Sequence, residues 1–181
     1  MNYTEPIRSK KIIRNILIYL KNKNDRDYML FLLGIHTGLR ISDLLRLRIR
    51  DIKDKTHITL TEKKTKKSRK ILINKELKME LKEYCKGKQH YEYLFQSREG
   101  GNNPITRTRA YQILLDTGYV FGIHISCHTL RKTFGYTHYK QNNDVVYLME
   151  IFNHATPRIT LRYIGVMQDE LDKSTAEMSF L

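Results

Sequence analysis

Apolar residues recur at helical spacing in the first part of the chain, where they predict three helices. The first helix follows Ser9, a favoured N-cap, and has its apolar positions on one face: Ile12, Ile13, Ile16, Leu17 and Leu20. A second helix is expected to begin at residue 24 or 25 and to end near Gly38, because glycine readily adopts the left-handed conformation of a C-cap. A third helix is expected over residues 42–47.

The pattern changes between residues 56 and 74, where it predicts a β-hairpin. Residues 56–61 alternate in polarity and are rich in β-branched side chains, whereas residues 70–74 form a short apolar run. Six of the ten residues from Thr61 to Lys70 are lysine or arginine. Because charged side chains are seldom buried without partners, we expect the turn between the strands to lie outside the core.

Helical spacing then returns and continues to the end of the chain. One helix is expected from Asn103 or Thr106 through Leu115, and four others are predicted over 75–86, 129–140, 144–152 and 157–163. We therefore predict a mainly α fold with a small antiparallel β-sheet (α+β), in a single domain over residues 1–165. Residues 166–181 form a C-terminal tail or helix whose apolar side chains need a surface, either their own core or a neighbouring subunit: Met167, Leu171, Met178, Phe180 and Leu181.

Charge narrows the choice of partner. The 181 residues include 33 Lys and Arg against 19 Asp and Glu, a formal net charge of +14, on a composition that is otherwise globular. This balance favours an anionic polymer as partner, nucleic acid before a membrane surface.

No apolar run approaches the roughly 20 residues of a membrane helix. Residues 1–11 have no apolar core and no small-residue cleavage site, so we expect no secretory signal. Cys85 and Cys127 are interpreted as reduced thiols, and we therefore expect a cytoplasmic protein without a metal site.

A basic globular protein can also cut the nucleic acid that it binds. Breaking a phosphodiester without a metal requires a nucleophile, cations on the non-bridging oxygens and an acid for the leaving oxygen. Arginine suits the second role because its planar fork matches two phosphate oxygens. Candidate groups lie in four short segments: Gly38-Leu39-Arg40-Ile41-Ser42-Asp43, Lys64-Thr65, His128-Thr129-Leu130-Arg131, and His154 followed nine residues later by Tyr163.

These segments, in this order, resemble the tyrosine recombinase (phage integrase) family, whose catalytic fold is shared with the type IB topoisomerases. The resemblance extends from about residue 8 to Tyr163. It implies that Tyr163 attacks the scissile phosphate to form a 3′-phosphotyrosyl link, while Arg40 and Arg131 hold the non-bridging oxygens. Lys64 would protonate the leaving 5′-oxygen. His128 would serve in proton transfer around the tyrosine hydroxyl, and His154 would hydrogen-bond a phosphate oxygen. No cofactor is implied.

The resemblance leaves several choices open. Asn153 stands where the family usually has glycine before the second histidine, and asparagine tolerates left-handed backbone. Asp43 is expected to hold Arg40 or to cap its helix. Lys63, Lys66 and Lys67 are alternatives to Lys64, and with Arg69 they are expected to contact DNA. Arg107 and Arg109 are further candidates for phosphate contact, with a solvated helix face as the alternative. Each catalytic candidate also has a structural interpretation, such as a helix cap or a solvated turn.

The whole-protein prediction is a site-specific recombinase acting on double-stranded DNA as a tetramer, with residues 166–181 docking on a neighbouring protomer and no membrane partner. About 8 residues precede the first helix, whereas most integrases carry a separate DNA-binding domain there. A non-catalytic DNA-binding regulator or directionality factor would need the charge but not the tyrosine beside two arginines. A type IB topoisomerase-like enzyme would use the same chemistry on a single duplex.

Overall fold

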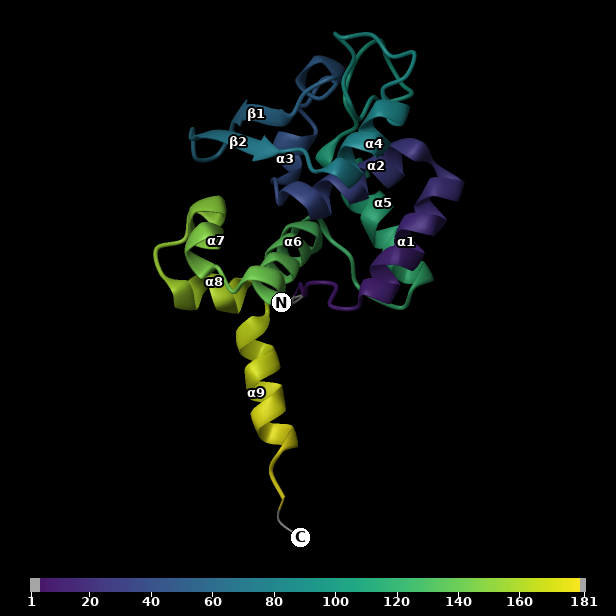
Figure 1. Cartoon of the computed structure of the whole chain (residues 1–181). Helices are drawn as coiled ribbons and strands as arrows, with labels where there is room; N and C mark the ends of the chain where they lie inside the picture. Colours follow the sequence, from purple (N-terminus) through teal and green to yellow (C-terminus); the bar gives the residue numbers. More distant parts are fainter. Residues whose placement is uncertain (1–3, 180–181) are drawn as a thin grey trace.

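The computed structural model describes residues 4–179, and it confirms a mainly helical fold with one small antiparallel sheet (Figure 1). In chain order the elements are α1 (Lys10–Lys23), α2 (Asp25–Thr37), α3 (Ile41–Leu44), the 3-10 helix η1 (Ile49–Asp51), β1 (His57–Thr61), β2 (Ser68–Leu72), α4 (Lys75–Tyr84), α5 (Arg107–Val120), α6 (Cys127–Asn142), α7 (Val145–Phe152), α8 (Pro157–Tyr163) and α9 (Val166–Ala176). None of the helices in the described part is long and apolar enough to cross a membrane.

Local capping chemistry sets most helix ends. The Ser9 hydroxyl accepts a hydrogen bond from the Ile12 amide, and the Asn24 side chain accepts from the first turn of α2. Gly38 ends α2 in the left-handed conformation at φ 59°. The helix α6 begins two residues before its predicted start, because Ser126 and Thr129 form a reciprocal capping box. His128 therefore lies in the first turn of α6.

The prediction for residues 42–47 was wrong in extent. The helix α3 begins after Arg40 and ends at Leu44. Its continuation is prevented by a distant segment: the amide of Leu94 donates to the Leu47 carbonyl at 2.8 Å, and Arg48 forms a β-bridge with Tyr93. Smaller differences are that β2 lies two residues earlier than predicted and that α5 continues five residues beyond position 115.

The hairpin pairs β1 with β2 from His57 opposite Leu72 to Thr61 opposite Ser68. Inward positions follow the alternation of β1, with Ile58 fully buried. The expectation of a solvated turn is confirmed for its four lysines, which are exposed, but it is wrong for Glu62, which is 2% exposed. This carboxylate can be buried because two arginines pair with it, Arg40 and Arg69.

Two apolar clusters flank α6. The larger one is centred on α2, where residues 29–34 are buried, and Gly34 lets α6 approach so closely that a Cβ there would lie 2.6 Å from Leu130 Cδ1. The smaller cluster joins α6 to α7 and α8 and contains Leu148, Phe152, Ile164 and Val166. In Figure 1, α6 accordingly lies between the α1–α2–α5 group and the α7–α8 pair, and the hairpin lies above α7.

The helix α9 projects away from the rest of the molecule (Figure 1). Its base is anchored by Asp169, which accepts hydrogen bonds from Arg8 at 2.7 Å and from the Tyr136 hydroxyl at 2.8 Å. Farther along, Leu171 and Met178 are 60% and 59% exposed, so residues 4–179 leave both side chains largely uncovered. Phe180 and Leu181, which the sequence grouped with them, lie outside the described residues.

Candidate active site

The fold brings both predicted arginines into one region, where Arg131 is held from two sides. Arg131 lies on α6 and is 4% exposed. Its guanidinium donates to the Gly38 carbonyl and, at 3.1 Å, to the Ile151 carbonyl. It also lies 4.7 Å from the centroid of the Phe152 ring. Burial lowers the pKa of Arg131 to about 10, so the group remains a cation at neutral pH.

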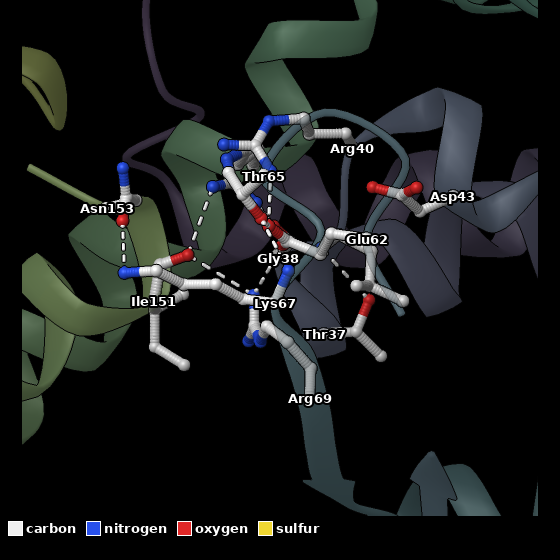
Figure 2. Close-up of polar contacts among 12 residues, drawn as sticks. Thr37, Gly38, Arg40, Asp43, Glu62, Thr65, Lys67, Arg69, Ile151 and Asn153 are labelled. Atoms are coloured by element: carbon white, nitrogen blue, oxygen red, sulfur yellow. Dashed lines mark hydrogen bonds and ion pairs between the residues drawn. The ribbon is translucent and has the colours of Figure 1, made fainter. Parts of the chain in front are cut away.

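Arg40 reaches the same region from the start of α3. Its side chain is 20% exposed, and its Nη1 pairs with Glu62 Oε2 at 2.6 Å (Figure 2). The positive charge of Arg40 contributes to the low pKa of Arg131, which means that the two cations lie close together. Two neighbouring guanidiniums with unused N–H donors make a binding site for an anion.

Tyr163 ends α8 beside these cations. Burial raises the pKa of its hydroxyl, whereas the charge of Arg131, a hydrogen bond with Arg131 and the charge of Arg40 act in the opposite direction. The net pKa lies above the usual 10.0, so the phenol is protonated at neutral pH. Its ring is in T-shaped contact with the rings of Phe152 and His154, with centroids 5.2 Å and 5.1 Å away. Tyr163 also lines a surface hollow of about 630 Å³ together with three cations, Lys132, Arg158 and Arg162.

Both predicted histidines are neutral at physiological pH. Burial lowers the pKa of His128, and the nearby charges of Arg107 and Arg131 lower it further. Burial and the charges of Arg131 and Arg40 do the same for His154. His154 Nδ1 lies 3.1 Å from the Thr160 hydroxyl, which fixes the ring. The turn before it is made by Asn153 at φ 57°, which confirms that asparagine takes the left-handed conformation here.

The four turn lysines differ in their contacts. Lys64 is exposed, and its ammonium group forms no hydrogen bond or ion pair within residues 4–179. Lys67 Nζ donates to Asn153 Oδ1 at 2.6 Å and so joins the hairpin to the α7–α8 turn (Figure 2). Lys63 and Lys66 have exposed side chains.

The three arginines that were predicted to contact DNA also differ in their exposure and contacts. The side chain of Arg69 is 9% exposed and donates to Glu62 and to the Ile151 carbonyl, each at 3.2 Å, so it is used inside the protein. Arg107 is exposed beside His128 and lines a hollow of about 530 Å³ with it. Arg109 is exposed on a different surface hollow, which it shares with Arg26.

The sequence interpretation was wrong for one acidic residue, Asp43, and missed another, Glu62. Asp43 neither holds Arg40 nor caps α3; its carboxylate accepts from the Lys63 amide at 2.8 Å and so tethers the hairpin. Glu62 was not singled out, because it stands in a run of lysines. The alternation of β1 was the available signal, since Ile58, Leu60 and Glu62 occupy one face.

Arg158 and Arg162 were also missed, although their spacing of four places them on one face of α8.

The assembled groups suit chemistry on a phosphodiester. Arg40 and Arg131 offer a cradle for a phosphate, Tyr163 offers a hydroxyl beside it, and His128 and His154 offer neutral imidazoles. The described part of the chain holds no group of three His, Cys, Asp or Glu side chains that could bind a metal ion.

The sequence of the chain is similar to those of known proteins. A sequence profile of the Phage integrase family matches residues 8–170. "Probable integrase/recombinase YoeC" of Bacillus subtilis is 48% identical over 170 residues, which cover 93% of each protein. "Tyrosine recombinase XerA" of Pyrococcus furiosus is 28% identical over 172 residues, which cover 93% of this chain and 60% of that protein. The chain thus spans 93% of the first relative and 60% of the second, which is less than two thirds of that protein.

Solved structures show the same fold. The crystal structure of XerA recombinase superposes with a TM-score of 0.76 at 19% identity, covering 99% of this chain and 68% of that one. XerH site-specific recombinase bound to palindromic difH substrate, in a post-cleavage complex, gives a TM-score of 0.71 at 17% identity, covering 97% of this chain and 54% of that one.

Proposed function

Because the chain belongs to the phage integrase family, we propose that it is a site-specific DNA recombinase that cuts and rejoins strands through a covalent 3′-phosphotyrosyl intermediate. The observation that carries the proposal is the contact of Tyr163 with Arg131, with the charge of Arg40 acting on both. A protein that only binds DNA needs surface cations, but it does not need a tyrosine hydroxyl hydrogen-bonded to a buried arginine and close to the charge of a second one.

In this mechanism Arg40 and Arg131 bind the two non-bridging oxygens of one phosphate. The Tyr163 oxygen attacks phosphorus, and a bond from phosphorus to the phenolic oxygen forms as the bond to the 5′-oxygen breaks. His128 takes part in moving the phenolic proton, and Lys64 protonates the leaving 5′-oxygen. The reverse attack by the 5′-hydroxyl of another strand restores the phosphodiester and releases Tyr163. The phosphotyrosyl bond conserves the energy of the original bond, so no cofactor is required.

The protonation states fit these roles. The phenol is protonated at rest, so it needs a partner that can accept its proton, and a neutral imidazole is such a partner. The same arginine charges that bind phosphate favour the phenolate, because an opposite charge stabilises the ionised form. His154 is held by Thr160 and so can present its other ring nitrogen to a phosphate oxygen.

Double-stranded DNA is the proposed partner. The cations that remain exposed around the site, Lys63, Lys64, Lys66, Arg107, Arg158 and Arg162, supply contacts to the phosphates on either side of the scissile one. For recombination between two duplexes we propose a tetramer on DNA. The projecting helix α9 and the residues that follow it support this arrangement, because Leu171 on the helix and Met178 after it are available to dock on a neighbouring protomer.

The proposed function is tested by capturing covalent protein–DNA complexes from genomic DNA and sequencing the attached ends. The proposal predicts 3′ ends that recur at one short sequence and that disappear with Tyr163→Phe. Ends scattered without sequence preference, together with relaxation of any supercoiled plasmid, would instead indicate topoisomerase-like activity. A regulator that only binds DNA would give no covalent ends and would act unchanged with Tyr163→Phe.

A further inference from the structure

We propose that Glu62 is a positioning residue of this site: its buried carboxylate orients the guanidinium of Arg40 and fixes the turn that carries Lys64. The inference rests on the recombinase function proposed above. Glu62 does not touch the phosphate in this account, and it acts through the two residues that it holds.

Both carboxylate oxygens of Glu62 are engaged. Oε2 accepts hydrogen bonds from Arg40 Nη1 and from the Thr65 hydroxyl, each at 2.6 Å. Oε1 accepts from Arg69 Nη1 at 3.2 Å. Figure 2 shows these side chains converging on Glu62 from the hairpin and from the start of α3. A single acidic side chain therefore links Arg40 to the hairpin.

For Arg40, the hydrogen bond to Glu62 determines the direction in which the guanidinium points. Glu62 is the only side chain within residues 4–179 that accepts a hydrogen bond from its guanidinium. An arginine has five N–H donors in a rigid planar fork, so one short contact through Nη1 orients the other donors. With Nη1 held, Nη2 and Nε remain for a phosphate.

For Lys64, the link determines the path of the turn. Thr65, its immediate neighbour, is held by Glu62 Oε2. The main chain of Glu62 closes the same turn, because its amide donates to the Lys67 carbonyl and its carbonyl accepts from the Lys66 amide, each at 3.0 Å. The backbone on both sides of Lys64 is thus fixed, although its ammonium group is exposed.

The arginines around Glu62 offset its negative charge, so the carboxylate does not repel DNA. A bare carboxylate next to a phosphate site would oppose binding, but the two arginines that pair with Glu62 leave the trio with one net positive charge. The second arginine, Arg69, also donates to the Ile151 carbonyl, which accepts from Arg131 as well. Glu62 is therefore connected to both phosphate-binding arginines.

The test measures single-turnover formation of the covalent adduct at saturating DNA with two substrates. One has the natural 5′-oxygen as leaving group, and the other has sulfur there, which leaves as a thiolate and needs no proton. Glu62→Gln removes the charge and keeps the shape, whereas Glu62→Asp keeps the charge. Glu83→Gln removes an equal charge from an exposed position of α4 and serves as the matched control.

We expect Glu62→Gln to slow cleavage of the oxygen substrate by about tenfold or more, since general acid catalysis alone contributes at least that factor. The sulfur substrate should lose less, Glu62→Asp should recover part of the rate, and the dissociation constant for DNA should stay within about threefold of wild type. A defect in folding alone would slow both substrates equally. Equal losses on the two substrates would overturn the part of the proposal that concerns Lys64, and rates like those of Glu83→Gln would overturn the role of Glu62 entirely. Either result would leave the recombinase function standing. No adduct with the wild-type protein would overturn both.

Discussion

The guanidinium of Arg131 donates a hydrogen bond to the backbone carbonyl of Gly38, which lies 93 positions earlier in the chain. Gly38 also ends α2 in the left-handed conformation and comes two residues before Arg40. One glycine therefore sets where α2 ends, where Arg40 begins its approach to the site, and what the second arginine is held against. The guanidinium of Arg131 and the start of the segment that carries Arg40 are thus positioned by neighbouring backbone atoms.

Gly38→Ala is predicted to disturb both arginines. At φ 59° a side chain costs roughly 1–2 kcal/mol, and a Cβ at this position would lie 2.4 Å from Phe134 Cδ1. We expect a loss in the free energy of unfolding beyond the backbone term, measured in urea by circular dichroism, together with loss of the covalent adduct. Gly87→Ala is the control, because its φ is also positive but nothing lies within 4 Å of the new Cβ. Equal destabilisation by the two variants would contradict the close contact with Phe134.

Gly135→Ala is predicted to displace the segment that carries Tyr163. A Cβ there would lie 2.6 Å from Ile164 Cγ2 and 2.7 Å from the Phe152 ring, in the small cluster that joins α6 to α7 and α8. Overpacking of this kind costs about 1–3 kcal/mol. We expect slower adduct formation, because Ile164 follows Tyr163 directly and Phe152 contacts its ring. Gly101→Ala, where a Cβ meets nothing within 4 Å, should change neither stability nor rate.

Acid is predicted to remove the stabilisation that Glu62 provides. Burial by itself raises the pKa of Glu62, but hydrogen bonds from Thr65 and Arg40 and the arginine charges outweigh it, so the pKa lies below the usual 4.5. A carboxyl group with a lower pKa in the folded state stabilises the fold above the unfolded pKa and loses that effect as pH falls through the folded value. The difference in unfolding free energy between wild type and Glu62→Gln should therefore be largest near neutral pH and shrink below pH 4.5. A difference that does not change with pH would show that the ionised pair contributes nothing.

DNA affinity is predicted to fall steeply with salt, and the slope should report individual contacts. Each lysine or arginine that neutralises a phosphate contributes about 0.9 to the slope of log affinity against log salt concentration. Lys63→Ala removes an exposed cation next to Lys64 and keeps the backbone contact to Asp43, so we expect the slope to drop by about that amount. Lys173→Ala, on α9, removes a cation that pairs with Glu177 at 3.7 Å and should leave the slope unchanged. A slope that stays at the wild-type value in Lys63→Ala would mean that Lys63 does not contact a phosphate.

Much of the fold could be predicted because local chemistry decides it. Ser9 and Asn24 begin helices through their side chains, and Gly38 ends one through its conformation, without help from distant residues. The prediction failed where a distant segment competes, as at Leu47, which pairs with the Leu94 amide instead of continuing α3. No pattern within residues 42–47 contains that information.

The candidate site also divides into residues that the local sequence identifies and residues whose contacts come from distant segments. The motif residues Arg40, Arg131, His154 and Tyr163 were identifiable from their order along the chain, and the structure places them together. The roles of Glu62 and Arg69 depend on burial, which local polarity misjudges, because in a run of basic residues both resemble solvated side chains. Only the neighbours supplied by α3 and α7 turn Glu62 into a buried partner of two arginines.

The central claim is that Tyr163 is the nucleophile, and a nicked DNA substrate that loses its leaving strand after cleavage tests it most directly. We predict a covalent protein–DNA adduct on a denaturing gel that persists when a chelator removes divalent metals. Tyr119→Phe, at a tyrosine that is 88% exposed, should form the adduct like wild type, whereas Tyr163→Phe should form none. An adduct that survives Tyr163→Phe, or one that the chelator abolishes, would contradict the account.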